Sequence, residues 1–317
     1  MTANIAIKNA RIAQLEEDKR KSSASESLYQ KALGRLWRDR LTMTMIFILL
    51  VLVVFALGAP VIETVLGTTY TDIDLENKFA PVGAVGHPLG TDDLGRDQLA
   101  RLAYAGRVTL GIAFVAAIIS IVIGIALGII MGYYGGVVDD FILWVITTLT
   151  SIPSLFLLII IAAIFRPGPV TITLVLGLLG WTGTTRLVRG ETLSLREREF
   201  VISARAMGAS PLHIMWQHIL PNLISVLVIT LAIDIGGLML TEAALSFLGI
   251  GVQPPTPTWG NMLSNSRDFI RTPNAWQLIV FPGLLITFSV LCFYVIGDGV
   301  RDAFDPMIRQ RSANKPK

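Results

Sequence analysis

Long stretches without Asp, Glu, Lys or Arg constrain this chain more than any other feature. Six of them approach or exceed the roughly 20 apolar residues that an α-helix needs to cross a bilayer. They span residues 41–62, 108–138, 141–165, 167–185, 212–233 and 272–297, and the fifth continues past two acids to about residue 250. The sequence therefore predicts an all-α, polytopic membrane protein with six transmembrane helices.

The composition supports this prediction. Of the 317 residues, 53% are hydrophobic and only 15% are charged, whereas soluble domains carry about 25% charged residues. Together with a mean hydropathy of +0.64, this excludes a soluble enzyme. A net charge of +3 would fit a nucleic-acid-binding protein, but the hydropathy argues against a nucleic-acid partner. The single Cys292 excludes a disulfide within the chain and a cysteine-rich metal site.

Lys and Arg set the expected orientation, because positively charged flanks stay in the cytoplasm. If there are six spans, 19 of the 26 cationic residues fall on the side that carries both termini. We therefore expect both termini in the cytoplasm. The resulting regions are a partly disordered cytoplasmic tail (1–40), a first transmembrane helix that is not cleaved (41–62), an external loop (63–107), a transmembrane core (108–300) with a cytoplasmic loop (186–222), and a cytoplasmic tail (301–317).

Small residues and prolines predict how the spans pack. Gly124, Gly128 and Gly132 recur at every fourth position of the second span, which lets another helix approach closely. Pro153 in the third span and Pro282 in the sixth each interrupt the ladder of backbone hydrogen bonds. We expect a close helix contact along the three glycines and a kink at each proline.

The cytoplasmic loop predicts a helical elbow. Residues 191–207 are good helix formers, and Gly208 supplies a flexible or left-handed residue that ends the helix. Ser210 then caps a second short helix that has Pro211 in its first turn. Two interpretations remain open: a rigid knob that fits a groove on a soluble partner, or an amphipathic linker at the membrane surface.

The ionisable residues of the apolar segments give few candidates for chemistry. Asp234 and Glu242 lie in the fifth span, where a charge is costly unless it is paired or hydrated. They would line a transport pathway or form structural hydrogen bonds. His213 and His218 are five residues apart, about 500° around an α-helix, so we expect no metal pair. The sequence has no phosphate-binding loop, so any ATP would be bound by another chain.

Several motifs resemble a known family. The segment SARAMGASPLHIMWQHILPN is similar to the cytoplasmic signature of ATP-binding-cassette importer permeases, with matches at Ala204, Gly208, Leu220 and Pro221. The segments HPLGTDDLGRDQLARLAYAGRVTLGIA, RLVRGETLSL, TEAALSFLGIGVQPPTPTWGNML and IGDGVRDAFDP resemble the second permease subunit of dipeptide, oligopeptide and nickel importers. The resemblance covers about residues 30 to 308.

This resemblance implies a type I importer permease in the bacterial cytoplasmic membrane. Its implied partners are a homologous second permease, two ATPase subunits that hold ATP and Mg, an external binding protein, a peptide substrate and the lipid bilayer. It implies no enzyme activity and no cofactor in this chain. The implied contacts with the ATPase are Glu199, Ala204, Arg205, Ala206 and Gly208, and candidate external contacts are Asp92, Arg96 and Asp97.

Other functions remain open from the sequence. The same machinery would also suit nickel or glutathione as cargo. An ion-coupled secondary carrier would instead use Asp234 and Glu242 as its proton or cation site, and it would need no ATPase partner. For the external loop, a hydrogen-bonded surface cap is the alternative to a docking role.

Overall fold

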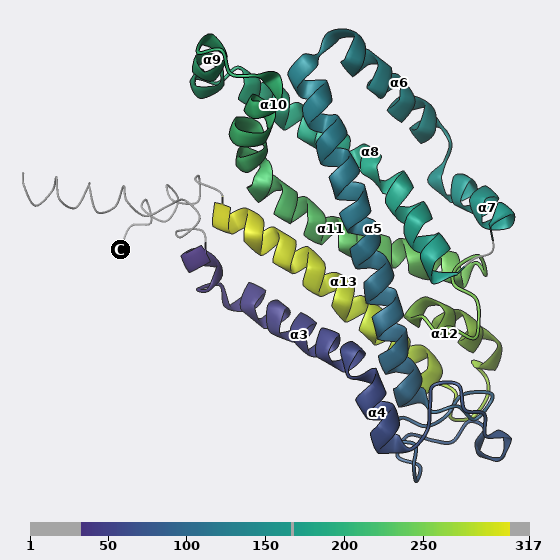
Figure 1. Ribbon diagram of the computed structural model, residues 1–317. Coiled ribbons are helices and arrows are strands. Elements are labelled where there is room, and N and C mark those ends of the chain that lie inside the picture. Colours follow the sequence, from purple (N-terminus) through teal and green to yellow (C-terminus); the bar gives the residue numbers. More distant parts are fainter. Residues whose placement is uncertain (1–32, 166–167, 305–317) are drawn as a thin grey trace, which may run out of the picture.

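The computed structural model describes residues 33–165 and 168–304, which form an elongated bundle of helices (Figure 1). The predictions for most of the two tails lie outside these residues. The helices that build the bundle are α3 (Arg40–Leu57), α4 (Ala59–Leu66), α5 (Gln98–Tyr134), α6 (Gly136–Ser151), α7 (Ser154–Ile164), α8 (Pro169–Arg196), α11 (Leu220–Phe247) and α13 (Gln277–Phe304). Shorter elements lie at the ends: η1 (Leu75–Asn77), α9 (Glu199–Ala206), α10 (Pro211–Ile214), η2 (Met215–Ile219), α12 (Trp259–Asn265) and η3 (Ser266–Phe269).

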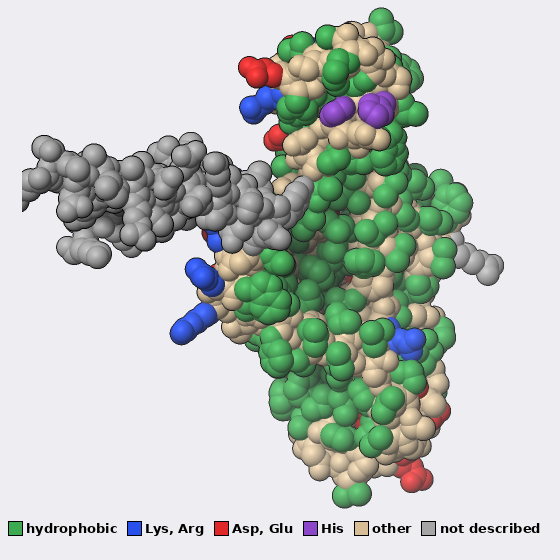
Figure 2. Space-filling view, turned by 60° about the vertical axis from the view of Figure 1, so that its left-hand side comes forward, with side chains coloured by type: hydrophobic (Ala, Val, Ile, Leu, Met, Phe, Trp, Pro, Cys, Tyr) green, Lys and Arg blue, Asp and Glu red, His purple; other side chains and the backbone are tan. Residues whose placement is uncertain are grey.

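Within the described ranges, five helical segments are long and apolar enough to cross a membrane. They are α3, α5, α8, α13 and the continuous run Pro211–Phe247 that contains α11. Apolar side chains cover the side of the bundle between its two ends (Figure 2). This band is the surface that a lipid-embedded protein presents.

The third predicted span differs from the expected single kinked helix. The structure has two shorter helices, α6 and α7, separated by Ile152 and Pro153 in extended conformation. Proline has no N–H to donate and disfavours the helical conformation at the residue before it. The helix therefore stops completely at Ile152. Pro282, by contrast, lies inside a continuous α13.

Two helix boundaries also differ from the prediction. α5 begins at Gln98, well before residue 108, because the Asp97 carboxylate caps it by accepting a hydrogen bond from the Ala100 N–H at 2.8 Å. The sequence pattern assigned residues 98–107 to the external loop because this segment contains arginines. The first span ends at Leu57, and Gly58 joins it to a separate helix, α4.

The predicted glycine contact is confirmed, and its partner is α8. A Cβ atom added at Gly128 would lie 2.6 Å from Val188 Cβ and 2.8 Å from the Thr185 carbonyl oxygen. Gly124 and Gly132 face Thr184 and Thr192 one turn away on either side. We call this contact the glycine seam. It holds the backbones of α5 and α8 closer than any larger side chain would allow.

The bundle has two distinct ends (Figure 1). One end carries α9, α10 and η2, and we call residues 199–219 the elbow. The opposite end carries a folded loop, residues 67–97, packed near α12, and we call it the loop cap. α5 runs from one end to the other, so both ends are connected through one helix of 37 residues.

Candidate functional site

The elbow has the predicted glycine turn. Gly208 has φ +84°, a left-handed conformation that favours glycine. The N–H groups of Gly208 and Ala209 donate to the carbonyls of Arg205 and Ala204 and so close the end of α9. Ser210 Oγ then accepts from the His213 N–H at 3.3 Å and starts α10 at Pro211. The prediction of helix, glycine turn and capped second helix is confirmed.

The predicted single helix over 191–207 is wrong. α8 ends at Arg196, and Arg198 takes an extended conformation as the N-cap of α9. The Arg196 side chain turns back, donating to the Gly132 carbonyl at 3.1 Å and to Glu197 Oε1 at 3.0 Å. The contact with Gly132 joins positions 64 residues apart, so local helix propensity could not indicate it.

One face of the elbow is part of the protein core. Val201, Ile214 and Ile219 are fully buried, and Ala204 is 3% exposed. They pack in one cluster with Val188 of α8. Ala204 is therefore a packing residue on the inner face of α9, and the same cluster includes Leu223, so the elbow packs against both α8 and α11.

The opposite face of the elbow exposes large apolar side chains. Met207, which directly precedes the glycine turn, is 83% exposed. The other members of this apolar patch are Phe200, Ile202, Leu212 and Trp216, exposed between 41% and 63%. The predicted contact residues Glu199, Arg205, Ala206 and Gly208 are also exposed. Exposed apolar side chains in such number are typical of a surface that binds a protein partner or a membrane.

Polar contacts tie the elbow and its supporting helices together. The guanidinium of Arg205 lies 5.5 Å from the centre of the Tyr133 ring, which joins α9 to the end of α5. Arg189 of α8 donates to both carboxylate oxygens of Asp139 in α6, at 2.5 and 2.6 Å. A movement of α9 is therefore transmitted to α5 through Tyr133, and a movement of α8 is transmitted to α6 through Asp139.

The two histidines of this region lie together, contrary to the prediction. The ring centres of His213 and His218 are 5.7 Å apart. The reason is that Met215–Ile219 forms a π-helix, in which each turn takes about one more residue than an α-helix. The angle of 500° holds only for an α-helix, and the residue types here do not indicate a π-helix.

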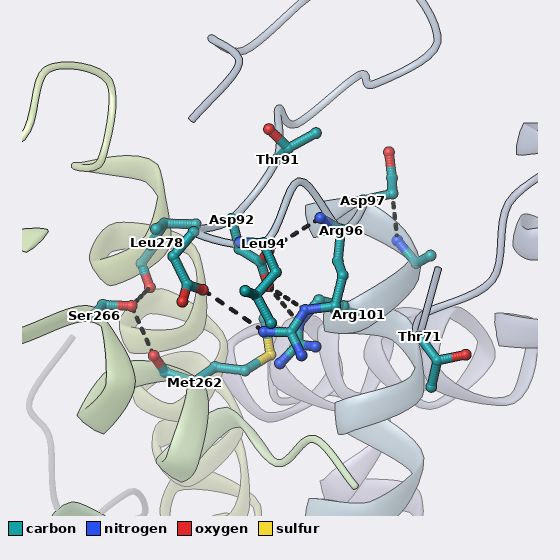
Figure 3. Close-up of polar contacts among 12 residues, drawn as sticks. Thr71, Thr91, Asp92, Leu94, Arg96, Asp97, Arg101, Met262, Ser266 and Leu278 are labelled. Atoms are coloured by element: carbon teal, nitrogen blue, oxygen red, sulfur yellow. Dashed lines mark hydrogen bonds and ion pairs between the residues drawn. The ribbon is translucent and has the colours of Figure 1, made fainter. Parts of the chain in front are cut away.

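At the other end, the predicted external residues lie inside the loop cap (Figure 3). The Asp92 carboxylate accepts from the N–H groups of Leu94 and Arg96 and from Arg96 Nε, the last at 2.7 Å. Asp97 is fully buried and, besides capping α5, lies 2.8 Å from His87 Nδ1. These two carboxylates hold the loop in shape, as the surface-cap alternative expected. A docking role for the loop stays a prediction.

A small polar cavity lies under this loop, and the sequence did not indicate it. Its volume is about 20 Å³, and Gln98, Arg101 and Met262 are among its lining residues. Gln98 is 1% exposed and Arg101 is 5% exposed. Arg101 Nε forms an ion pair with Asp92 Oδ2 at 3.3 Å, whereas the Gln98 amide atoms and Arg101 Nη1 have no hydrogen-bond partner among the described residues. A polar cavity of this volume is large enough for about one water molecule.

The two acids of the fifth span are far apart. Asp234 accepts from Thr184 Oγ1 at 3.1 Å and so links α11 to α8. Glu242 is fully buried and accepts from Ser246 Oγ at 2.8 Å. They are separated by eight residues of one continuous helix, about 12 Å along its axis. They therefore do not form a single ion site, and no group of three or more potential metal ligands occurs among the described residues.

These features define a class: a polytopic helical membrane protein with a structured elbow at one end of the bundle. Residues 124–310 match the model of the binding-protein-dependent transport system inner membrane component. The chain belongs to this family.

Relatives of known role match nearly the whole chain. The chain is 38% identical to the oligopeptide transport system permease protein OppC of Escherichia coli (strain K12), over 89% of this chain and 92% of that protein. It is 34% identical to the dipeptide transport system permease protein DppC of Bacillus subtilis (strain 168), over 90% of this chain and 88% of that protein.

The fold also matches a solved structure of the MetNI methionine ABC transporter in inward facing conformations. The TM-score is 0.50 at 21% identity, over 64% of this chain and 95% of that chain. The protein is thus a multi-pass permease subunit of an ABC importer of the inner membrane. Such subunits are transport components and not enzymes, and they work with a further permease and with separate subunits that bind ATP.

Proposed function

We propose that this chain is one of two permease subunits of an ATP-driven importer of oligopeptides or dipeptides. The names of its relatives support this cargo. Its further partners would be an external peptide-binding protein and a peptide substrate. The permease breaks no bond, and it exposes its pathway alternately to the two sides of the membrane.

The observation that carries the mechanism is the two-faced elbow. Its inner face is packed into the bundle around Ala204, and its outer face exposes Met207 beside the turn at Gly208. The outer face would dock in a groove of the ATP-binding subunit, with Glu199, Arg205 and Ala206 at its edges. Closure of the two ATP-binding subunits would then move α9 together with the helices to which it is fixed.

The orientation follows from the charges. The elbow belongs in the cytoplasm, because the chain's cationic residues concentrate with it on one side of the six predicted spans. The loop cap then faces outward, where the solvent-accessible parts of Arg96 and its neighbours would meet the binding protein. Both termini would be cytoplasmic.

Reconstitution tests this function. The chain is purified with its partner permease and ATP-binding subunits, placed in liposomes, and supplied with binding protein and labelled peptide. We expect uptake that requires ATP. Uptake of nickel or glutathione but not of peptides would show that peptides are not the cargo. Uptake driven by an ion gradient without ATP would favour a carrier that uses Asp234 and Glu242.

A further inference from the structure

The π-helical turn of the elbow brings two histidines together. His213 lies on α10 and is exposed, and His218 lies in η2 and is half-buried. In Figure 2, two histidine side chains lie next to each other near the end of the molecule that carries the elbow. The chain has only one other histidine, His87, which contacts Asp97 in the loop cap.

The geometry of the two rings suits a shared metal ion. A transition metal lies about 2.0–2.1 Å from each coordinating imidazole nitrogen, which places the centres of two coordinating rings roughly 5–6 Å apart. The observed separation is 5.7 Å, with 65° between the ring planes. Imidazole nitrogens suit Zn²⁺, Cu²⁺ and Ni²⁺.

The helix type decides whether the pair exists. In a continuous α-helix, residues five apart differ by about 500°, so their side chains diverge by about 140°. The π turn adds the residue that returns His218 to the side of His213. Metal binding by this pair therefore depends on the π register and stabilises it.

We propose that His213 and His218 form a two-histidine site for a divalent transition metal on the elbow. The two imidazole nitrogens are the protein ligands, and water completes the coordination, because the described residues supply no third histidine, cysteine or carboxylate to the group. A bound ion bridges α10 to η2 and fixes the π turn that contains His218.

Binding is measured with Cu²⁺ on the assembled transporter, purified through a tag without histidines. We expect one Cu²⁺ per chain with two nitrogen ligands in its electron paramagnetic resonance spectrum. His213→Ala and His218→Gln should each weaken Cu²⁺ binding at least about tenfold, a change of about 1.4 kcal/mol. His87→Ala should leave binding unchanged. Identical spectra and affinities for the native chain and His213→Ala would overturn the site.

A second variant tests the register. Combining Gln217→His with His218→Ala moves the histidine to the position four residues after His213, which is the correct spacing for an α-helix. We expect this pair to bind Cu²⁺ more weakly than the native pair. Equal or tighter binding would overturn the π register on which the site depends.

The effect on transport rests on the proposed coupling role of the elbow. We expect Zn²⁺ to slow ATP-driven uptake in the native transporter and not in His213→Ala. If Cu²⁺ binds as described and Zn²⁺ leaves uptake unchanged, the elbow does not need to change register during transport. If neither the native transporter nor the His213→Ala variant showed ATP-driven uptake in the absence of Zn²⁺, the result would instead contradict the proposed function.

Discussion

The glycine seam makes a quantitative prediction at Gly128. In Gly128→Ala, the new methyl group would lie 2.6 Å from Val188 Cβ and 2.8 Å from the backbone oxygen of Thr185. Favourable contacts between such atoms need about 3.5–4.0 Å, so α5 and α8 must separate by roughly 1 Å. Neither neighbour is the end of a flexible side chain, and the strain cannot be removed by a rotamer change. Overpacking of this kind costs about 1–3 kcal/mol.

Gly111→Ala is the matched control. Gly111 lies on the same helix, and nothing lies within 4 Å of its added Cβ. Replacing a helical glycine there stabilises the helix by about 0.5–1 kcal/mol. The two variants make the same chemical change and differ only in what the methyl group meets.

The assay is thermal unfolding of the detergent-purified transporter, followed by the fluorescence of a thiol dye at buried Cys292. At about 2–4 °C per kcal/mol, Gly128→Ala should lower the melting temperature by several degrees. Gly111→Ala should leave it unchanged or raise it. If Gly128→Ala melted at the same temperature as Gly111→Ala, the close packing of α5 against α8 would be refuted.

Three further substitutions test the elbow, the contact between α6 and α8, and the loop cap. Gly208→Val forces a β-branched residue into a left-handed conformation at a cost of about 1–2 kcal/mol, so the amount of peptide taken up per ATP hydrolysed should fall. Gly208→Asn should retain more of this coupling. An equal amount of uptake per ATP in the two variants would contradict the role of the turn. Asp139→Asn weakens the pair with Arg189 and should lower the melting temperature by more than the same change at exposed Asp140. Asp92→Asn should expose the loop cap to proteolysis, whereas unchanged cleavage would argue against its holding role.

The sequence predicted those parts of the fold that depend on local residue type. The turn at Gly208 and the cap at Ser210 followed from conformational preferences of single residues. The glycine spacing predicted a close contact, although only the structure identified α8 as the partner. Local sequence patterns predict turns, caps and close contacts of this kind because each depends on residues that lie within a few positions of one another.

The features that sequence reasoning missed depend on distant partners or on cooperative geometry. At the end of α8, Arg196 donates a hydrogen bond to the Gly132 carbonyl, 64 residues away. Gln98 and Arg101 precede the charge-free segment that predicts the second span, and in the structure they belong to α5 and line a small polar cavity. The π turn that joins His213 to His218 has no signature in residue type.

Cross-linking at Met207 tests the central claim most directly. Cys292 is buried and is the chain's only cysteine, so a photoactivatable thiol reagent will react with the Met207→Cys variant at one exposed position. Val85→Cys, at a fully exposed position of the loop cap, is the control. If the elbow docks on the ATP-binding subunit, illumination of the assembled transporter will join that subunit to the Met207→Cys chain and not to the Val85→Cys chain. Capture of the ATP-binding subunit from Val85→Cys, or its absence from an assembled Met207→Cys transporter, would contradict the claim.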